Sequence, residues 1–232
     1  MNIEKRTIHH IPALLWGTER ERLILAVHGS HSSKIDDCIW VLAEEATARG
    51  YGVLSFDLPQ HGERVYETEP CMVSSCVGEL AEVYQFACET AHEVSLFGCS
   101  MGAYFSLLAF ADVPIARAWF LSPVTDMKRI IQNMMAACNI SEETLEKLQT
   151  IQTPYETLYW DYFRYVKEHP IVSWPHPTQI LRGENDSLSE LASVADFAAR
   201  FHCALTEQPG GEHWFHTAEE LDYFRRWLRE GL

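Results

Sequence analysis

A serine between two glycines, in the run Gly98-Cys99-Ser100-Met101-Gly102, is the part of this sequence best suited to covalent chemistry. The run follows apolar residues 93–97 and precedes a helical pattern over 103–111. At a strand-to-helix turn of this kind, the two glycines avoid steric clashes and the serine backbone is expected to be strained. The pattern therefore predicts a nucleophilic hydroxyl on Ser100 that is lifted clear of the sheet. The N–H of Met101, at the start of the helix, should point at the oxygen of a bound carbonyl.

Short apolar runs elsewhere in the chain predict the strands that must position this serine. Each run is four to six residues long, continuous rather than alternating, and separated from the next by a helical pattern. Such runs are typical of a parallel sheet buried on both faces, which indicates an α/β fold with a mostly parallel central sheet covered by helices on both sides. The runs are Leu23–Val27, Val53–Phe56, Val94–Phe97, Ala116–Leu121 and Thr178–Leu181.

Helical patterns lie between and after these runs. Apolar residues recur at helical spacing over 39–46, with Asp36 near the start and Gly50 just past the end, and again over 80–87. The last helix, near 217–229, opens with the capping-box pattern Thr217-x-x-Glu220. Each pattern is amphipathic, so we expect these helices to cover the faces of the sheet.

Two regions depart from this alternation. The residues before Leu23, including 8–16, predict one or two leading strands, and an antiparallel edge would tolerate Pro12. From 124 to about 175 the strand pattern stops, with a helical stretch beginning near Ser141 and seven aromatic residues over 155–174. We interpret the chain, 1–232, as a single domain with a small helical cap inserted at about 124–175.

The charge and cysteine content narrow the range of partners. With 18 Lys and Arg against 33 Asp and Glu, the formal net charge is -15, which argues against nucleic acid and anionic membrane surfaces as partners. No apolar run reaches the length of a spanning helix and the first residues are polar, so we expect neither stable membrane insertion nor a signal peptide.

Seven scattered cysteines without a Cys-x-x-Cys pair favour reduced thiols and a cytoplasmic location. No metal-binding motif stands out among the eleven histidines, so no metal is expected.

Taken together, the motifs resemble those of the α/β-hydrolase superfamily. His28-Gly29-Ser30 is similar to the oxyanion loop, 57–62 to the loop after the next strand, 98–102 to the nucleophile elbow, and 183–186 to the acid loop; His213 completes the set. The motifs come in the family's order and cover nearly the whole chain outside the cap. The match is to small esterases and lipases, which implies an α/β-hydrolase fold, carboxylic ester hydrolysis, a small-molecule ester substrate and no cofactor.

A serine hydroxyl needs a neutral imidazole to accept its proton. His213, in Gly210-Gly211-Glu212-His213, is our candidate, because it lies on a glycine-rich loop just before the final helix and preserves the family's order of serine, acid and histidine. His216, three residues later, is the rival. The alternative is a loop histidine that only packs against Trp214 and Phe215.

A carboxylate must fix the tautomer of that imidazole. Asp186 is favoured by its position in the acid loop, and the pattern Ser187-x-x-Glu190 predicts a capping box that leaves Asp186 free to turn inward. Asp126, which follows the strand ending at Leu121, competes for the role. Glu184 is a weaker candidate.

The resemblance also implies two backbone donors for the oxyanion, the N–H groups of Ser30 and Met101. His28 is expected to orient its loop through the ring, and Asp57 to act as a hydrogen-bonding anchor at a strand end. Neither is expected to take part in proton transfer.

The sequence therefore predicts a serine hydrolase that cleaves esters of short-to-medium or aromatic acyl groups through an acyl-enzyme. Met134 and Met135 are candidates for an apolar pocket wall, whereas most aromatic residues of 155–174 are expected to hold the cap helices together. A peptidase or amidase on the same fold is an open alternative, since the leaving group is not readable from the motifs. A binding module without activity is the other alternative.

Overall fold

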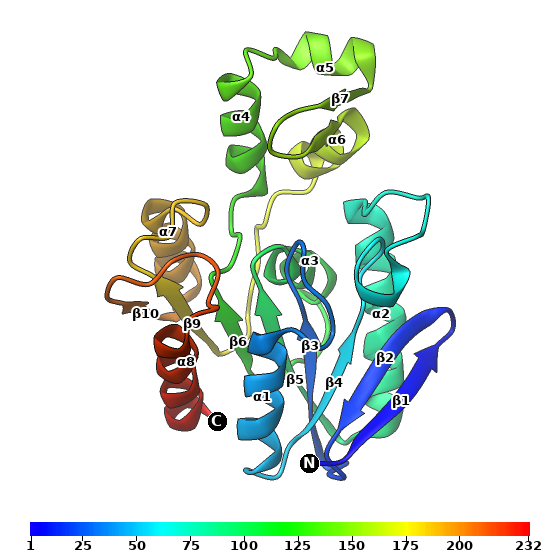
Figure 1. Cartoon of the computed structure of the whole chain (residues 1–232), viewed down its shortest axis with the longest axis vertical. Helices are drawn as coiled ribbons and strands as arrows, with labels where there is room; N and C mark the ends of the chain where they lie inside the picture. The colour runs from blue at the N-terminus through cyan, green and yellow to red at the C-terminus, as the bar shows by residue number, and fades with distance from the viewer.

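The computed structural model describes residues 1–232 and contains one large mixed sheet with helices on both faces (Figure 1). The strand order is β1-β2-β4-β3-β5-β6-β9-β10, and the six strands from β4 to β10 in this order are parallel. Only β1 and β2 pair antiparallel. The strands of this sheet are β1 Ile3–Ile8, β2 Ile11–Trp16, β3 Arg22–Val27, β4 Gly52–Phe56, β5 Glu93–Cys99, β6 Ala118–Leu121, β9 Thr178–Gly183 and β10 Ala204–Gln208.

Five helices cover the two faces of the sheet. Helices α2, α3 and α7 pack on one face with one set of buried side chains, and α1 and α8 pack on the other (Figure 1). The bounds of these helices are α1 Asp37–Thr47, α2 Val73–Thr90, α3 Met101–Ala109, α7 Leu191–Phe201 and α8 Ala218–Gly231, and a short 3-10 helix spans Gly62–Arg64. The α/β prediction with a mostly parallel, doubly covered sheet is confirmed.

Strand β3 shows why the apolar runs are continuous. Its alternate residues Leu23 and Leu25 belong to the core under α2 and α3, whereas Ile24 and Ala26 belong to the core under α1 and α8. Because successive side chains of a strand point to opposite faces, a strand covered on both sides must be apolar at every position. The five predicted runs all form strands, with ends that shift by at most two residues.

The termini of the helices follow from local chemistry. Asp36 caps α1 by accepting from the N–H of Asp37. Thr217 and Glu220 form the predicted capping box of α8, each side chain bonding the other's backbone N–H. The cap of α1 ends the loop that follows β3, and the capping box of α8 ends the loop that carries His213.

The edge of the sheet differs in part from the prediction. Pro12 lies in β2, which is an interior strand between β1 and β4. The ladder of β2 with β4 begins only at Ala13, so the missing N–H of Pro12 removes no bond on that side, and its carbonyl accepts from the N–H of Asp57 at 3.0 Å. Strand β10, at the other edge, was not predicted, because its partly exposed residues lack an apolar run.

The chain between β6 and β9 extends beyond the carboxyl ends of the strands, at the top of Figure 1. It contains helices and a small hairpin: α4 Met127–Ala137, α5 Glu142–Leu148, β7 Thr150–Gln152, β8 Thr157–Tyr159 and α6 Trp160–Glu168. The segment is mainly helical, as expected, but its small hairpin was not predicted. Its strands have only three residues each, too few for a readable period.

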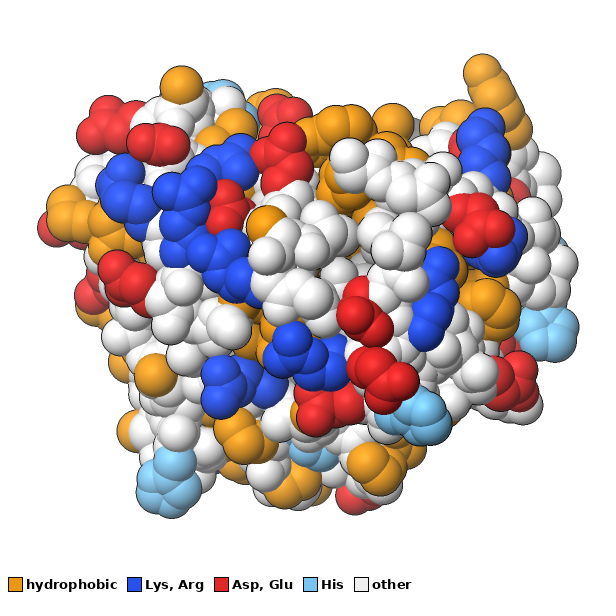
Figure 2. Space-filling view, turned by 90° about the horizontal axis from the view of Figure 1, so that it is seen from below, with side chains coloured by type: hydrophobic (Ala, Val, Ile, Leu, Met, Phe, Trp, Pro, Cys, Tyr) orange, Lys and Arg blue, Asp and Glu red, His pale blue; other side chains and the backbone are white.

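Acidic and basic side chains are intermixed on the face seen in Figure 2, at the end of the sheet opposite that segment. An ion-pair network joins α1 to α8: the buried carboxylate of Glu45 binds Arg225 at 3.0 Å and Arg229 at 3.0 Å. None of the helices combines the length and the apolar character needed to span a bilayer.

Candidate active site

Ser100 lies at the tight turn between β5 and α3, with φ 49° and ψ -118°. This positive φ is strained for a serine, as predicted. A Cβ at position 102 would lie 2.2 Å from the carbonyl oxygen of His28, and one at position 98 would lie 2.8 Å from the Cα of Ala103. The two glycines are therefore required by close backbone contacts, which confirms the steric part of the prediction.

Gly102→Ala should lower the free energy of unfolding by about 3 kcal/mol or more, because backbone atoms surround the new methyl group and cannot move away cheaply. Gly78→Ala is a matched control in helix α2, where a Cβ would meet nothing within 4 Å. It should instead raise stability by up to about 1 kcal/mol. Urea unfolding followed by circular dichroism measures both, and equal effects of the two substitutions would contradict this account of the turn.

Three side chains from separate loops meet beside this turn. The Oγ of Ser100 is 2.8 Å from Nε2 of His213, and Nδ1 of His213 is 2.8 Å from Oδ2 of Asp186. Ser100 and Asp186 are buried, and His213 is partly exposed. Since an ionised carboxylate only accepts hydrogen bonds, Nδ1 carries the proton and Nε2 is left to accept from the Ser100 hydroxyl. The structure thus places together the three residues that the sequence singled out.

The second oxygen of Asp186 is also occupied. Oδ1 accepts from the N–H groups of Leu188 and Ser189 at 3.0 and 2.8 Å. These bonds fix the carboxylate between the turn and the histidine, so that Oδ2 faces His213. Asp186 therefore organises its own loop as well as the imidazole.

The predicted capping box Ser187-x-x-Glu190 is wrong. Helix α7 begins at Leu191, and Glu190 is its N-cap without a side-chain cap bond. The Glu190 carboxylate instead binds Arg129 at 2.7 Å and accepts from Asn133 at 3.2 Å, both on α4. The backbone N–H groups in this turn that do bond a side chain, those of Leu188 and Ser189, donate to Asp186.

Each rival residue has a different partner. Asp126 caps α4, accepting from the N–H of Arg129 at 3.0 Å. Glu184 accepts from the N–H of Gly210 at 2.8 Å. The ring of His216 stacks on Trp214 and bonds its carbonyl oxygen. None of these side chains contacts Ser100 or His213 by a hydrogen bond.

The two expected oxyanion donors flank Ser100. Met101 is the first residue of α3, where an N–H has no acceptor within the helix. Ser30 is exposed in the loop after β3, and its N–H donates no hydrogen bond within the protein. Gly29 lets this loop approach closely, since a Cβ there would lie 3.1 Å from the Cβ of Ser100. Both backbone groups remain proposals as oxyanion donors.

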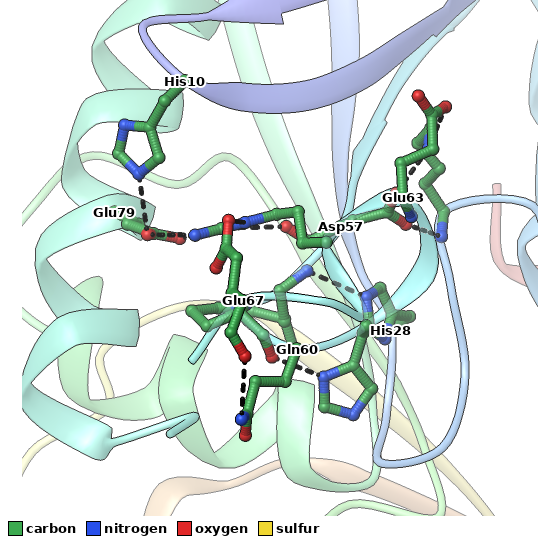
Figure 3. Close-up of polar contacts among 12 residues, drawn as sticks. His10, His28, Asp57, Gln60, Glu63, Glu67 and Glu79 are labelled. Carbon is green, nitrogen blue, oxygen red and sulfur yellow. Dashed lines mark hydrogen bonds and ion pairs between the residues drawn. The ribbon is translucent and has the colours of Figure 1, made fainter. Parts of the chain in front are cut away.

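His28 and Asp57 hold the surrounding loops (Figure 3). The buried ring of His28 bonds the carbonyl of Gly29 through Nδ1 at 2.7 Å and accepts from the N–H of Leu58 through Nε2 at 3.0 Å. Asp57 accepts from the N–H of Lys34 at 2.9 Å and pairs with the Lys34 ammonium. The ring of His28 thus ties the loop after β3 to the loop after β4, away from the proton path.

His28 should also give the protein a specific sensitivity to acid. Burial lowers the pKa of His28 to about 4, against an ordinary value of 6.5, although the bond to Gly29 opposes the shift. Below pH 6.5 the unfolded chain therefore binds this proton before the folded protein does, so stability falls between pH 6.5 and 4 by roughly 3 kcal/mol, whereas above pH 6.5 His28 has no effect.

Urea unfolding at pH 7 and pH 4.5 measures this dependence. His28→Asn should be less stable at pH 7 but lose less stability on acidification than the wild type. His216→Asn is the control at an exposed histidine and should keep the wild-type pH dependence. A pH dependence unchanged in His28→Asn would contradict the assignment.

Comparison with solved structures decides the fold. Est1E from Butyrivibrio proteoclasticus, solved with bound ferulic acid, superimposes with a TM-score of 0.82 at 18% identity over 98% of this chain and 97% of Est1E. The mouse alpha/beta hydrolase domain-containing protein 10 gives 0.80 at 13% identity, over 99% and 98% of the two chains. An esterase from Pyrococcus furiosus gives 0.71 at 16% identity, over 99% and 89%.

The chain has the α/β-hydrolase fold. This confirms the resemblance seen in the motifs at the level of the fold. No protein-family model matches the sequence, and no curated protein matches it. The similarity to these proteins is therefore visible in the structures, because the sequence identities are too low for a comparison of sequences to find it.

A cavity of about 1010 Å³ opens at Ser100 on this α/β-hydrolase fold. One wall comes from α4, through Met127, Ile130, Ile131 and Met134. Met135, the other candidate, is buried in the core instead. Successive residues of a helix differ by about 100° around its axis, so Met135 turns from the cavity edge toward the core.

The aromatic residues of 155–174 divide between two roles. Three line the cavity, namely Tyr155, Tyr159 and Tyr162. The other four pack against the main core, as expected for most of them: Trp160, Phe163, Tyr165 and Trp174.

Among the cavity residues to which the sequence analysis gave no role at the site are His61 and Cys71. Neither belongs to a recognisable motif for this role. The structure has no group of three His, Cys, Asp or Glu side chains arranged to hold a metal ion.

Proposed function

We propose that this protein is a serine hydrolase that cleaves carboxylic esters, with Ser100 as nucleophile, His213 as general base and Asp186 as the orienting acid. The observation that carries this proposal is the continuous hydrogen-bonded path from Ser100 Oγ through the imidazole to Asp186 Oδ2, with 2.8 Å at both steps. The path ends at a strained serine that lines a cavity large enough for a small ester.

In the first half of the reaction, Ser100 Oγ attacks the ester carbonyl while Nε2 of His213 takes the hydroxyl proton. Asp186 stabilises the imidazolium through the Nδ1–H. The N–H groups of Met101 and Ser30 bind the oxygen that becomes negative in the tetrahedral intermediate. The imidazolium then protonates the leaving alcohol, which departs and leaves an acyl group on Ser100.

The second half repeats the same proton movements with water. Nε2 of His213 removes a proton from a water molecule, which attacks the acyl carbonyl. Collapse of the second tetrahedral intermediate returns the proton to Ser100 and releases the carboxylic acid. No cofactor is needed for either half.

We also propose that residues 1–232 form one domain in which 124–175 are a cap over the site. The cap supplies the α4 wall, and its methionines and isoleucines favour an apolar acyl or alcohol group. Est1E has the same fold and was solved with ferulic acid, an aromatic acid, bound. This property of Est1E supports our proposal that the present protein prefers short-to-medium or aromatic acyl esters.

A panel of p-nitrophenyl esters, from acetyl to palmitoyl with an aromatic acyl member, tests the proposal. We expect turnover that depends on Ser100, with an optimum among short-to-medium or aromatic groups. Faster turnover of long-chain emulsified triglyceride would contradict the acyl preference. No turnover of any ester by folded protein would contradict the esterase itself and favour a peptidase, an amidase or a binding module.

A further inference from the structure

Two cysteines meet beside the Ser100 cavity, outside the serine machinery. Cys71 lies just before α2, and Cys76 lies in the first turn of that helix. Their Sγ atoms are 3.4 Å apart. Cys71 is partly exposed and lines the cavity, whereas Cys76 is fully buried behind it. The sulfur of Cys71 is thus accessible to small molecules in the cavity, whereas the sulfur of Cys76 lies behind it, in contact with Cys71.

The surroundings of Cys71 favour its thiolate. The hydrogen bond from Cys76 lowers the pKa of Cys71 to about 6, with a further contribution from a hydrogen bond to His61, while burial opposes the shift. Burial also opposes protonation of His61, yet its hydrogen bonds to Cys71 and to the Pro59 carbonyl raise its pKa. Both shifts favour the charged forms, because an imidazolium at His61 and a thiolate at Cys71 attract each other.

One nearby carboxylate would disfavour the thiolate, and the structure largely neutralises it. Glu79 follows Cys76 by three residues on α2, and its two carboxylate oxygens bind the guanidinium of Arg64 at 2.5 and 2.7 Å. The same carboxylate contacts His10 at 3.1 Å (Figure 3). The acidic group nearest to the pair is thus bound to a fixed cation.

We propose that Cys71 and Cys76 form a thiol–disulfide exchange site on the wall of the cavity, and that this site takes small-molecule disulfides such as oxidised glutathione. Cys71 is the attacking thiolate and Cys76 the resolving thiol. This site is independent of the proposed ester hydrolysis, although it shares the cavity with it.

The chemistry proceeds by two exchanges. The Cys71 thiolate attacks one sulfur of the small disulfide, forming a mixed disulfide and expelling one thiolate, which takes a proton from water. Cys76 then attacks the Cys71 sulfur, which forms the Cys71–Cys76 bond and expels the second thiolate, and the proton that Cys76 loses passes through solvent to this leaving thiolate. Two protein thiols are oxidised and one small disulfide is reduced to two thiols. The two Sγ atoms must approach by about 1.4 Å to reach a bond length near 2.05 Å, which is within reach of side-chain rotation.

Cys38, in the other pair of cysteines at the cavity, is less suited to attack than Cys71. Cys38 and Cys99 also line it, but the hydrogen bond with Cys99 and burial raise the pKa of Cys38 well above its ordinary value. Exchange should therefore begin at Cys71.

The test treats reduced full-length protein with oxidised glutathione at pH 7 and maps the products by peptide mass spectrometry. The wild type should form the Cys71–Cys76 bond, reversed by dithiothreitol. Cys76→Ser should instead retain one glutathionyl group on Cys71, Cys71→Ser should do neither, and Cys88→Ser, at an exposed cysteine of the same helix, should behave as the wild type. Modification of other cysteines ahead of Cys71, or a wild type without the bond, would overturn the proposal.

A second measurement needs no variant. Timed labelling of the wild type with iodoacetamide should modify Cys71 before the other six cysteines, with a rate that rises to half its maximum near pH 6. Labelling of Cys71 only at alkaline pH would overturn the thiolate assignment. Both measurements follow mass rather than turnover, so they stand whether or not the protein hydrolyses esters.

Discussion

Ser100→Ala is expected to lower kcat/KM for the best p-nitrophenyl ester by at least about 10³-fold while the protein stays folded. The reason is that the substitution removes the atom that forms the acyl-enzyme and leaves only binding and the oxyanion donors. Ester hydrolysis of the purified variant at saturating and subsaturating substrate measures the loss. Circular dichroism and urea unfolding show whether the fold is retained.

Ser95→Ala provides the matched control, because Ser95 is a buried serine of the same strand, β5. It should keep nearly wild-type turnover. His213→Ala should be almost as damaging as Ser100→Ala, since the serine hydroxyl loses its base. Wild-type turnover by Ser100→Ala would end the serine hydrolase proposal.

Asp186→Asn is expected to lower kcat by roughly 10²- to 10⁴-fold. An amide at this position presents its NH₂ group or a neutral oxygen to Nδ1 of His213, so it neither fixes the required tautomer nor stabilises the imidazolium. The backbone contacts with Leu188 and Ser189 can be kept by the amide oxygen, which makes loss of the fold a small part of the effect.

Asp126→Asn distinguishes the two acids that the sequence left open. Asp126 caps α4, and asparagine is a comparable cap, so this variant should retain most of the activity. Steady-state hydrolysis of one ester by Asp186→Asn and Asp126→Asn shows which of the two carboxylates the reaction requires. If Asp126→Asn were the damaging change and Asp186→Asn were not, the acid assignment would be wrong although the serine mechanism would stand.

Much of the fold was predictable because its signals are local. A doubly covered parallel strand must be apolar at each position, so the five central strands could be located from short runs alone. The glycines around Ser100 were predictable for a similar reason, since the turn requires them whatever the rest of the chain does. Strand β10 and the β7–β8 hairpin were not predicted, because short or exposed strands carry little hydrophobic pattern.

The candidate acid illustrates the limit of local reasoning. The sequence pointed to Asp186, but partly for a wrong reason: the capping box at Ser187 and Glu190 does not form. Glu190 instead contacts α4, more than fifty residues away in the chain, and no local pattern carries that information. The choice among Asp186, Asp126 and Glu184 rests on which oxygen faces Nδ1 of His213, which is a matter of distance in space.

The sequence by itself determined the α/β class, the elbow at Ser100 and the candidates for its base and acid, because motifs and hydrophobic periodicity are carried by neighbouring residues. Only the tertiary structure decided which carboxylate reaches His213, which face of α4 lines the cavity, and that Cys71 lies against Cys76 and His61 beside it. These features depend on packing between segments distant in the chain, where the position of each side chain is set by all its neighbours together.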